Sequence, residues 1–166
     1  MGQNRENQVL ELFYENPNQR FTIREISKIT KIPRATAHRI IESLKKQGLM
    51  NKENSANENL FFKTKKINFF IEKIVSSGLI EELINKLNPS CIILFGSIRK
   101  GESIKESDID IFIESQLKKD IDLYKFEKKI GHKIQLFIEP NIDKLQKNLF
   151  NNVINGIKIY GSLNLK

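Results

Sequence analysis

Residues 94–113 decide the fold of the C-terminal half and read Leu94-Phe95-Gly96-Ser97-Ile98-Arg99-Lys100-Gly101-Glu102-Ser103-Ile104-Lys105-Glu106-Ser107-Asp108-Ile109-Asp110-Ile111-Phe112-Ile113. Asp108 follows Ser97 by eleven residues, and Asp110 comes two residues later. Side chains alternate between the two faces of a strand, so both aspartates point one way while the isoleucines between and after them point into a core. Two carboxylates side by side repel each other, and a divalent cation relieves that repulsion. The pattern therefore predicts a binding site for Mg²⁺ in complex with a nucleoside triphosphate.

Length and composition narrow the class of protein. The 166 residues suffice for one medium domain or two small ones, and 39% of them are hydrophobic, which allows a core. The net charge of +8 and the pI of about 9.5 favour a polyanionic partner, either nucleic acid or nucleotide, although a generic basic surface has the same composition. The N-terminus lacks an apolar signal core, and no run of about 20 apolar residues could span a bilayer, so we expect a cytoplasmic protein.

Cysteine and histidine are too sparse for the commonest metal sites. Cys91 is the single cysteine, which excludes an intrachain disulfide and a cysteine zinc cluster, and we expect a small buried apolar side chain. The two histidines, His38 and His132, lie in different predicted elements, which disfavours a histidine metal site. Walker A, Gly-x-Gly-x-x-Gly and His-Glu-x-x-His motifs are also absent, which leaves the acidic pair as the main chemical signal.

Charge and patterning divide the chain into two halves. Residues 1–66 carry thirteen Lys and Arg against seven Asp and Glu, whereas the remaining residues carry fifteen against thirteen. Positive charge is therefore concentrated on the N-terminal side. We place an N-terminal domain at 1–66, a linker helix at 67–78 and a second domain at 79–166.

The N-terminal half has the pattern of three helices followed by a hairpin. Thr22 with Glu25 three residues later forms a capping box that begins the second helix. Pro33 suits the first turn of the third helix. Leu49-Met50 and Leu60-Phe61-Phe62 bracket a polar stretch, which predicts a two-stranded hairpin with a flexible tip.

This order resembles the winged helix-turn-helix DNA-binding domains of prokaryotic transcription regulators. The matching residues are Phe21–Ser27 for the positioning helix, Ile32–Ile41 for the recognition helix and Leu44–Leu49 leading into the wing. The resemblance implies that a helix near Arg34–Lys46 enters the major groove of double-stranded DNA, where Arg reads guanine edges and Lys holds phosphates. The residues expected on its outer face are Arg34, Thr36, His38, Arg39, Lys45 and Lys46. The alternative is a winged domain used only for protein contacts or dimerisation.

The C-terminal half alternates helices and strands. Periodicity predicts a helix over 79–87, a buried strand over 91–95, the aspartate strand over 108–113, a helix ended by Gly131, a strand over 133–138, a helix within 142–153 and a short strand over 157–160. The expected fold class is α+β, with a winged helix-turn-helix followed by an α/β domain on a small mixed sheet.

The glycine-serine turn and the acidic pair resemble the minimal nucleotidyltransferases of the DNA polymerase β-like superfamily. The matching segments are 94–97, Gly101-Glu102 and Ser107–Ile111, and the resemblance spans roughly residues 79–160. It implies a nucleotidyltransferase fold that uses ATP or another NTP with Mg²⁺ or Mn²⁺. The roles that it implies are metal binding and catalysis for Asp108 and Asp110, and nucleotide binding for Gly96, Ser97, Arg99 and Lys100. Many relatives have a basic residue where this chain has Ile98, which leaves the phosphate role of each basic side chain open.

The third catalytic carboxylate that is usual in this superfamily has no acidic counterpart here. In the strand Lys133–Glu139 the expected position is Gln135, whose amide binds Mg²⁺ weakly and cannot act as a base near pH 7. Three interpretations stay open. In the first, two aspartates suffice for slow catalysis. In the second, Glu139, Glu114 or a partner's residue takes the place of the third carboxylate. In the third, the site binds nucleotide without turning it over.

Two functions are consistent with these patterns. The first is transfer of NMP from an NTP to a protein or a nucleic-acid end, and small relatives that act as antitoxins make a helical toxin protein a candidate acceptor. The second is a DNA-binding transcriptional regulator whose nucleotidyltransferase-like half is catalytically weak or inactive and serves nucleotide sensing or dimerisation. A homodimer is expected because winged-helix regulators commonly bind DNA as dimers.

Overall fold

The computed structural model describes residues 2–163, which fall into two compact units. The first unit extends to Lys66 and includes the short segment Ser103–Lys105. The second unit comprises Ile67–Glu102 and the residues from Glu106 onward. Among the described residues, every helix is too short or too polar to span a lipid bilayer.

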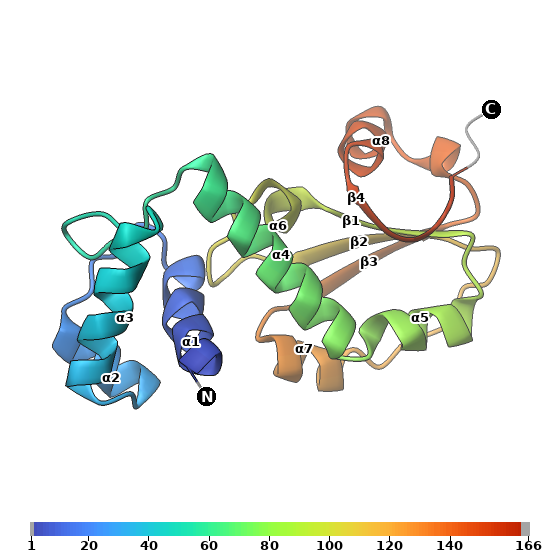
Figure 1. Cartoon of the computed structure of the whole chain (residues 1–166). Helices are drawn as coiled ribbons and strands as arrows, with labels where there is room; N and C mark the ends of the chain where they lie inside the picture. Colours follow the sequence, from blue (N-terminus) through green and yellow to red (C-terminus); the bar gives the residue numbers. More distant parts are fainter. Residues whose placement is uncertain (1, 164–166) are drawn as a thin grey trace. The chain divides into compact units, whose positions relative to one another are not determined.

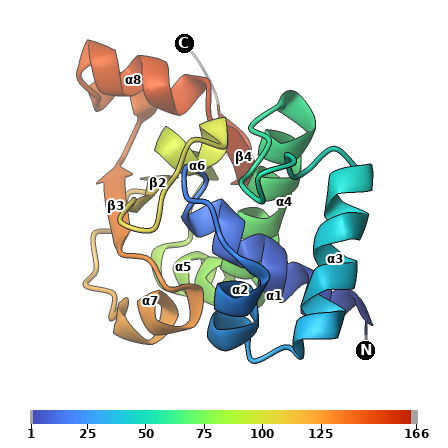
Figure 2. The same cartoon turned by 90° about the vertical axis from the view of Figure 1, so that its left-hand side faces the viewer.

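Three helices form the body of the first unit: α1 (Gly2–Glu15), α2 (Ile23–Thr30) and α3 (Arg34–Lys46) (Figure 2). The capping box is confirmed, because the Glu25 backbone N–H donates to Thr22 Oγ1 at 3.2 Å and the Thr22 N–H donates to Glu25 Oε2 at 2.8 Å. Apolar side chains from all three helices fill the core, with Phe13, Ile26 and Ile41 fully buried. Burial of this shared face stabilises helices that are individually too short to persist in water.

The predicted two-stranded hairpin is wrong. The wing is reduced to a single bridge between Met50 and Ala56 around a tight turn, in which the Asn51 N–H donates to the Ser55 carbonyl at 3.0 Å. Leu60-Phe61-Phe62 begin α4 (Leu60–Ser76) instead. Asn59 explains the difference, because its Oδ1 accepts the Phe62 N–H at 2.9 Å and so caps the helix.

A four-stranded mixed sheet forms the centre of the second unit (Figure 1). Its strands are β1 (Cys91–Phe95), β2 (Ile109–Glu114), β3 (Ile134–Glu139) and β4 (Ile157–Gly161), and their order is β3-β2-β1-β4. β1 pairs antiparallel with β2 and with β4, whereas β2 and β3 are parallel. The predicted fold class, with N-terminal helices and a small mixed sheet, is confirmed.

Helices cover both faces of this sheet. Figure 1 shows α8 (Lys147–Ile154), after the short turn η1 (Ile142–Lys144), on one face, and α5 (Leu79–Leu87) and α7 (Tyr124–Ile130) on the other. All five residues of β1 are therefore buried, which is typical of a strand covered on both sides. One cluster contains Cys91, Ile93, Phe95 and Phe112 from the strands, with Ile142 and Val153 from the helical side. The expectation that Cys91 is a buried apolar side chain is confirmed.

Candidate functional site

The glycine-serine turn lies at the end of β1, where the chain passes directly into the short helix α6 (Gly96–Lys100). Gly96 has φ +73°, a left-handed conformation that side chains rarely adopt. A Cβ at this position would overlap Asp110 Oδ2 and lie 3.0 Å from Asp110 Cγ. Phe95 pairs with Asp110 across the β1–β2 ladder, which places the aspartate next to the turn. The Asp110 carboxylate thus fills the space that a side chain at position 96 would need.

The two aspartates stand at the beginning of β2. Asp108 is exposed and immediately precedes the strand, while Asp110 is half-buried within it. Ile109 and Ile111 are buried on the opposite side, as the alternation predicts. Burial raises the pKa of Asp110 above its usual range, and the charge of Asp108 raises it further. The two carboxylates therefore repel each other unless a positive charge lies nearby.

Carboxylate oxygens are the ligands that Mg²⁺ and Mn²⁺ prefer, so the chemistry of Asp108 and Asp110 fits such an ion. Within residues 2–163, no group of three or more His, Cys, Asp or Glu is placed to hold a metal. The protein ligands available for an ion are thus the carboxylates of Asp108 and Asp110, together with any neutral oxygen atom of a neighbouring residue.

That neighbour is Gln135. In the parallel β2–β3 ladder, Asp110 is the register partner of Gln135, and the amide side chain is exposed. One step earlier along both strands, the Ile109 N–H donates to the Lys133 carbonyl at 2.8 Å, so Lys133 lies beside Asp108.

The Lys133 ammonium adds positive charge beside the two aspartates. It donates to Glu127 Oε2 at 2.9 Å, and this contact, with a smaller contribution from Asp108, raises the pKa of Lys133. The side chain therefore stays protonated near neutral pH and cannot accept a proton there. Sequence reasoning missed this neighbour, because only the strand register places it beside Asp108.

The acidic residues considered as substitutes for a third carboxylate lie at the opposite end of the strands. Glu114 pairs with Glu139 in the β2–β3 register, four residues beyond Asp110, which is roughly 13 Å along a strand. Glu114 also accepts hydrogen bonds from Ser90 Oγ at 2.7 Å and from the Ile142 N–H at 3.1 Å. Neither glutamate can serve the Asp108–Asp110 end within the same chain.

The remaining nucleotide-binding candidates all lie on α6. Ser97 and Arg99 are half-buried, and Lys100 is exposed in the last turn. Ile98 between them is fully buried. The structure thus brings Gly96 and Asp110 into contact and carries the three candidate side chains on the same short helix.

His132 supports the residue that precedes the aspartates, and sequence reasoning did not predict this contact. The ring is 4% exposed, and its Nδ1 lies 2.6 Å from the Ser107 carbonyl oxygen. Because a carbonyl can only accept, Nδ1 carries the proton. The ring also packs edge-on against Phe70, with centroids 5.2 Å apart. This contact positions the backbone immediately before Asp108.

A buried lysine holds the loop between α6 and the aspartate strand. Lys66 lies on α4 between the buried Phe62 and Phe70, is fully buried, and donates through Nζ to the Ser103 carbonyl. Lys105 donates its N–H to the Glu15 carbonyl at 2.9 Å. The segment Ser103–Lys105 is thereby fastened to the first unit.

All six candidate DNA-binding residues lie on α3. Arg34, His38, Arg39 and Lys46 are exposed, whereas Thr36 and Lys45 are half-buried. Lys45 also donates to Glu42 Oε1 at 3.0 Å. The opposite side of α3 packs into the core through its buried apolar residues.

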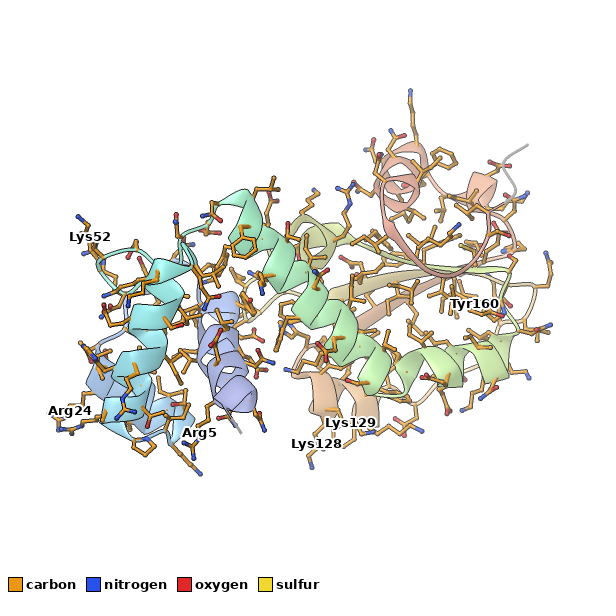
Figure 3. All side chains as sticks on the ribbon, in the orientation of Figure 1. Arg5, Arg24, Lys52, Lys128, Lys129 and Tyr160 are labelled. Carbon is orange, nitrogen blue, oxygen red and sulfur yellow. The ribbon has the colours of Figure 1, made fainter. Side chains whose placement is uncertain are left out.

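Two further basic side chains of the first unit are visible in Figure 3. Lys52 lies on the turn after α3 and Arg24 on α2, and both are exposed. Neither was among the residues that sequence reasoning selected for DNA contact.

Fold and site together define a nucleotidyltransferase-like domain preceded by a winged-helix unit. The family model described as nucleotidyltransferase domain matches residues 76–160, and the chain belongs to this family. The model of the MarR family matches residues 5–57, so the N-terminal unit is a MarR-type winged helix. Comparisons with the curated proteins and with the solved structures found no match.

Proposed function

We propose that the protein transfers NMP from ATP or another NTP to a protein or nucleic-acid acceptor, in the presence of Mg²⁺ or Mn²⁺, and that its N-terminal unit binds double-stranded DNA. The observation that carries the catalytic proposal is the close fit of the Asp110 carboxylate over Gly96, with Asp108 beside it. This fit supports the proposal, because the Asp110 carboxylate lies directly against a turn that has no side chain at position 96.

In this proposal Asp108 and Asp110 hold the divalent ion, which stabilises negative charge on the phosphate oxygens. Gly96 lets the triphosphate approach the backbone, and Ser97 contributes its hydroxyl and N–H group. Arg99 and Lys100 offset the charge of the triphosphate from the same helix. Together these residues align the α-phosphate for attack, and alignment with charge neutralisation supplies most of the rate in phosphoryl transfer.

We expect proton removal from the acceptor to be the slow step at this site. Gln135 beside Asp110 has no basic atom, and Lys133 beside Asp108 remains protonated. We therefore expect a slow transferase in which the acceptor proton passes to water.

The side-chain amide of Gln135 favours a second candidate function. A site with two carboxylates and Gln135 can bind a metal–nucleotide complex without consuming it. The protein would then be a DNA-binding regulator whose second unit senses nucleotide or supports dimerisation.

Label transfer separates the two functions. The protein is incubated with α-labelled NTPs, Mg²⁺ or Mn²⁺ and candidate acceptors, beside the variant Asp108→Ala/Asp110→Ala. A matched control, Asp120→Ala/Asp143→Ala, removes the same charge at exposed positions of the second unit. Transfer lost only in the first variant supports the enzyme. Nucleotide binding without transfer to any acceptor supports the regulator.

Assembly and the identity of a protein acceptor belong to the same proposal. A homodimer would present two α3 helices to successive half-sites of a duplex. A small helical toxin protein is the acceptor that the family resemblance favours if the acceptor is a protein. Sedimentation of the free protein and pull-down with a candidate toxin test these two points.

A further inference from the structure

The segment Ser103–Lys105 belongs to the first unit, although the residues on both sides of it belong to the second. On one side it follows α6, the helix of the candidate phosphate-binding residues, which ends at Lys100. On the other side, Asp108 comes three residues after Lys105. The turn helix and the aspartate strand of the candidate nucleotide site are therefore joined through residues that fold with the first unit.

Two hydrogen bonds hold this segment in the first unit. The Lys66 ammonium on α4 donates to the Ser103 carbonyl. The Lys105 N–H donates to the carbonyl of Glu15, the last residue of α1, at 2.9 Å. The last carbonyls of a helix have no partner within the helix, so the Lys105 bond also completes the end of α1.

The groups that meet at Ser103 are costly to bury. Lys66 is fully buried, and burial lowers its pKa to about 8, with Glu58 and Glu15 partly offsetting the change. The ammonium therefore stays mostly charged at neutral pH, at a desolvation cost that an apolar side chain would not have. The Ser103 side chain is also fully buried, and its Oγ has no hydrogen-bond partner among residues 2–163. Costs of this kind call for an explanation other than stability, and functional sites are where proteins most often carry them.

The second unit holds the other end of the same loop. The His132 Nδ1–H donates to the Ser107 carbonyl at 2.6 Å. Only Glu106 separates Ser107 from Lys105, which is held in the first unit. A link of one residue is too short to absorb a displacement of the segment, because consecutive Cα atoms keep a fixed spacing. Movement of Ser103–Lys105 is therefore passed on to Asp108, the neighbour of Ser107.

The helices that hold the segment are packed together with the candidate DNA-binding helix. α1 packs against α2 and α3 in the core of the first unit. Tyr14 of α1 also packs edge-on against Phe62 of α4, with ring centroids 5.2 Å apart. A ligand that binds only the folded first unit makes local opening of that unit rarer, and such opening would release the Ser103 carbonyl. Duplex DNA bound to α3 therefore favours the fastened segment.

We infer that Lys66 is a positioning residue of the nucleotide site, and that through it the binding of duplex DNA by the first unit tightens the binding of a metal–nucleotide complex by the second. The inference rests on the proposed function, because it concerns the same two ligands. While the Ser103 carbonyl is held, the short link to Ser107 keeps Asp108 and the end of α6 in place. When the hold is lost, the nucleotide must order them at a cost to its affinity.

The coupling is measured on the full chain by calorimetric titration with Mg²⁺ and a non-hydrolysable ATP analogue. The titration is done with and without a saturating short DNA duplex at low salt, where phosphate contacts supply binding to any sequence. The parent protein should bind the analogue at least about fivefold more tightly with DNA, and the analogue should tighten DNA binding by the same factor. In Lys66→Met this factor should fall to about one, while DNA binding alone is unchanged.

Lys65→Met is the matched control, because it removes an exposed lysine from the next position of α4. It should keep the full coupling factor. In Arg34→Ala/Arg39→Ala, which should bind DNA weakly, the same amount of duplex should have less effect on nucleotide affinity.

A second variant tests the link without changing the buried lysine. Two glycines inserted between Lys105 and Glu106, which are both exposed in a turn, lengthen the link while Lys66 stays in place. Insertions at exposed turns are well tolerated, so this variant should fold and lose the coupling even if Lys66→Met does not fold. Hydrogen exchange of residues 103–108 should slow when DNA binds to the parent protein or to Lys65→Met, and this slowing should be absent in Lys66→Met.

Each outcome decides between the parts of the argument. Coupling that is lost in Lys66→Met and in the insertion, and kept in Lys65→Met, supports the inference. A parent protein that binds both ligands independently would overturn it and leave the proposed function intact, as would coupling that survives in both variants. A parent protein that fails to bind one of the ligands would overturn the proposed function and the inference together.

Discussion

Replacing Gly96 with alanine tests whether the close approach of Asp110 to the turn matters for function. The backbone at Gly96 has φ +73°, which costs an L-residue roughly 1–2 kcal/mol. The new methyl carbon would lie 3.0 Å from Asp110 Cγ, whereas carbon atoms pack best at roughly 3.5–4.0 Å. Because the methyl carbon would also overlap Asp110 Oδ2, which is nearer than Cγ, the carboxyl group must move by at least roughly 1 Å.

A shift of this size should damage catalysis more than stability. Misplacement of a reacting group by about 1 Å can cost on the order of a hundredfold in rate, so label transfer by Gly96→Ala should fall by about that factor. Calorimetric titration with Mg²⁺ and a non-hydrolysable triphosphate should show weaker binding, because one carboxylate no longer meets the ion as before. Thermal unfolding should report the backbone cost together with the cost of moving the Asp110 carboxyl group.

Gly48→Ala provides the matched control. Gly48 has the same φ of +73°, and a Cβ there would meet no atom within 4 Å. Both variants should lose the backbone contribution to stability, Gly96→Ala should lose somewhat more because Asp110 must move, and only Gly96→Ala should lose nucleotide binding and transfer. Equal nucleotide affinities in the two variants would refute the functional role assigned to the contact between Gly96 and Asp110.

Three further predictions address other parts of the molecule. Burial lowers the pKa of Lys66 from 10.5 to about 8, so the unfolded chain holds this proton more tightly. The free energy of unfolding should rise with pH above about 8, by at most about 1.4 kcal/mol per pH unit, and urea titrations should find this rise lost in Lys66→Met. Arg34→Ala and Arg39→Ala should each weaken duplex DNA binding and reduce its salt slope by about 1 if the residue contacts a phosphate, and an unchanged affinity would count against groove insertion. Gln135→Asp should lower thermal stability in EDTA, because a third carboxylate adds repulsion beside Asp110, and should increase both stabilisation by Mn²⁺ and label transfer; a variant that responds to Mn²⁺ like the parent would contradict this placement.

Much of the fold could be predicted because its signals are local. The capping box at Thr22 and Glu25, the buried strand over 91–95 and the helix ended by Gly131 all depend on residues within a few positions of one another. The hairpin prediction failed at Leu60-Phe61-Phe62, since three apolar residues in a row fit either a strand or a buried helical turn. The cap supplied by Asn59 decides for the helix.

For the candidate site, sequence alone determined the acidic pair and the glycine-serine turn, because strand alternation and backbone freedom act over short distances. Tertiary structure decided which side chains stand next to that pair. Strand register sets Gln135 beside Asp110 and Lys133 beside Asp108, and it carries Glu114 and Glu139 to the far end of the sheet. Burial of Lys66 against the Ser103 carbonyl likewise joins residues 37 positions apart. Such pairings depend on long-range packing of the whole chain, which no local pattern of residues specifies.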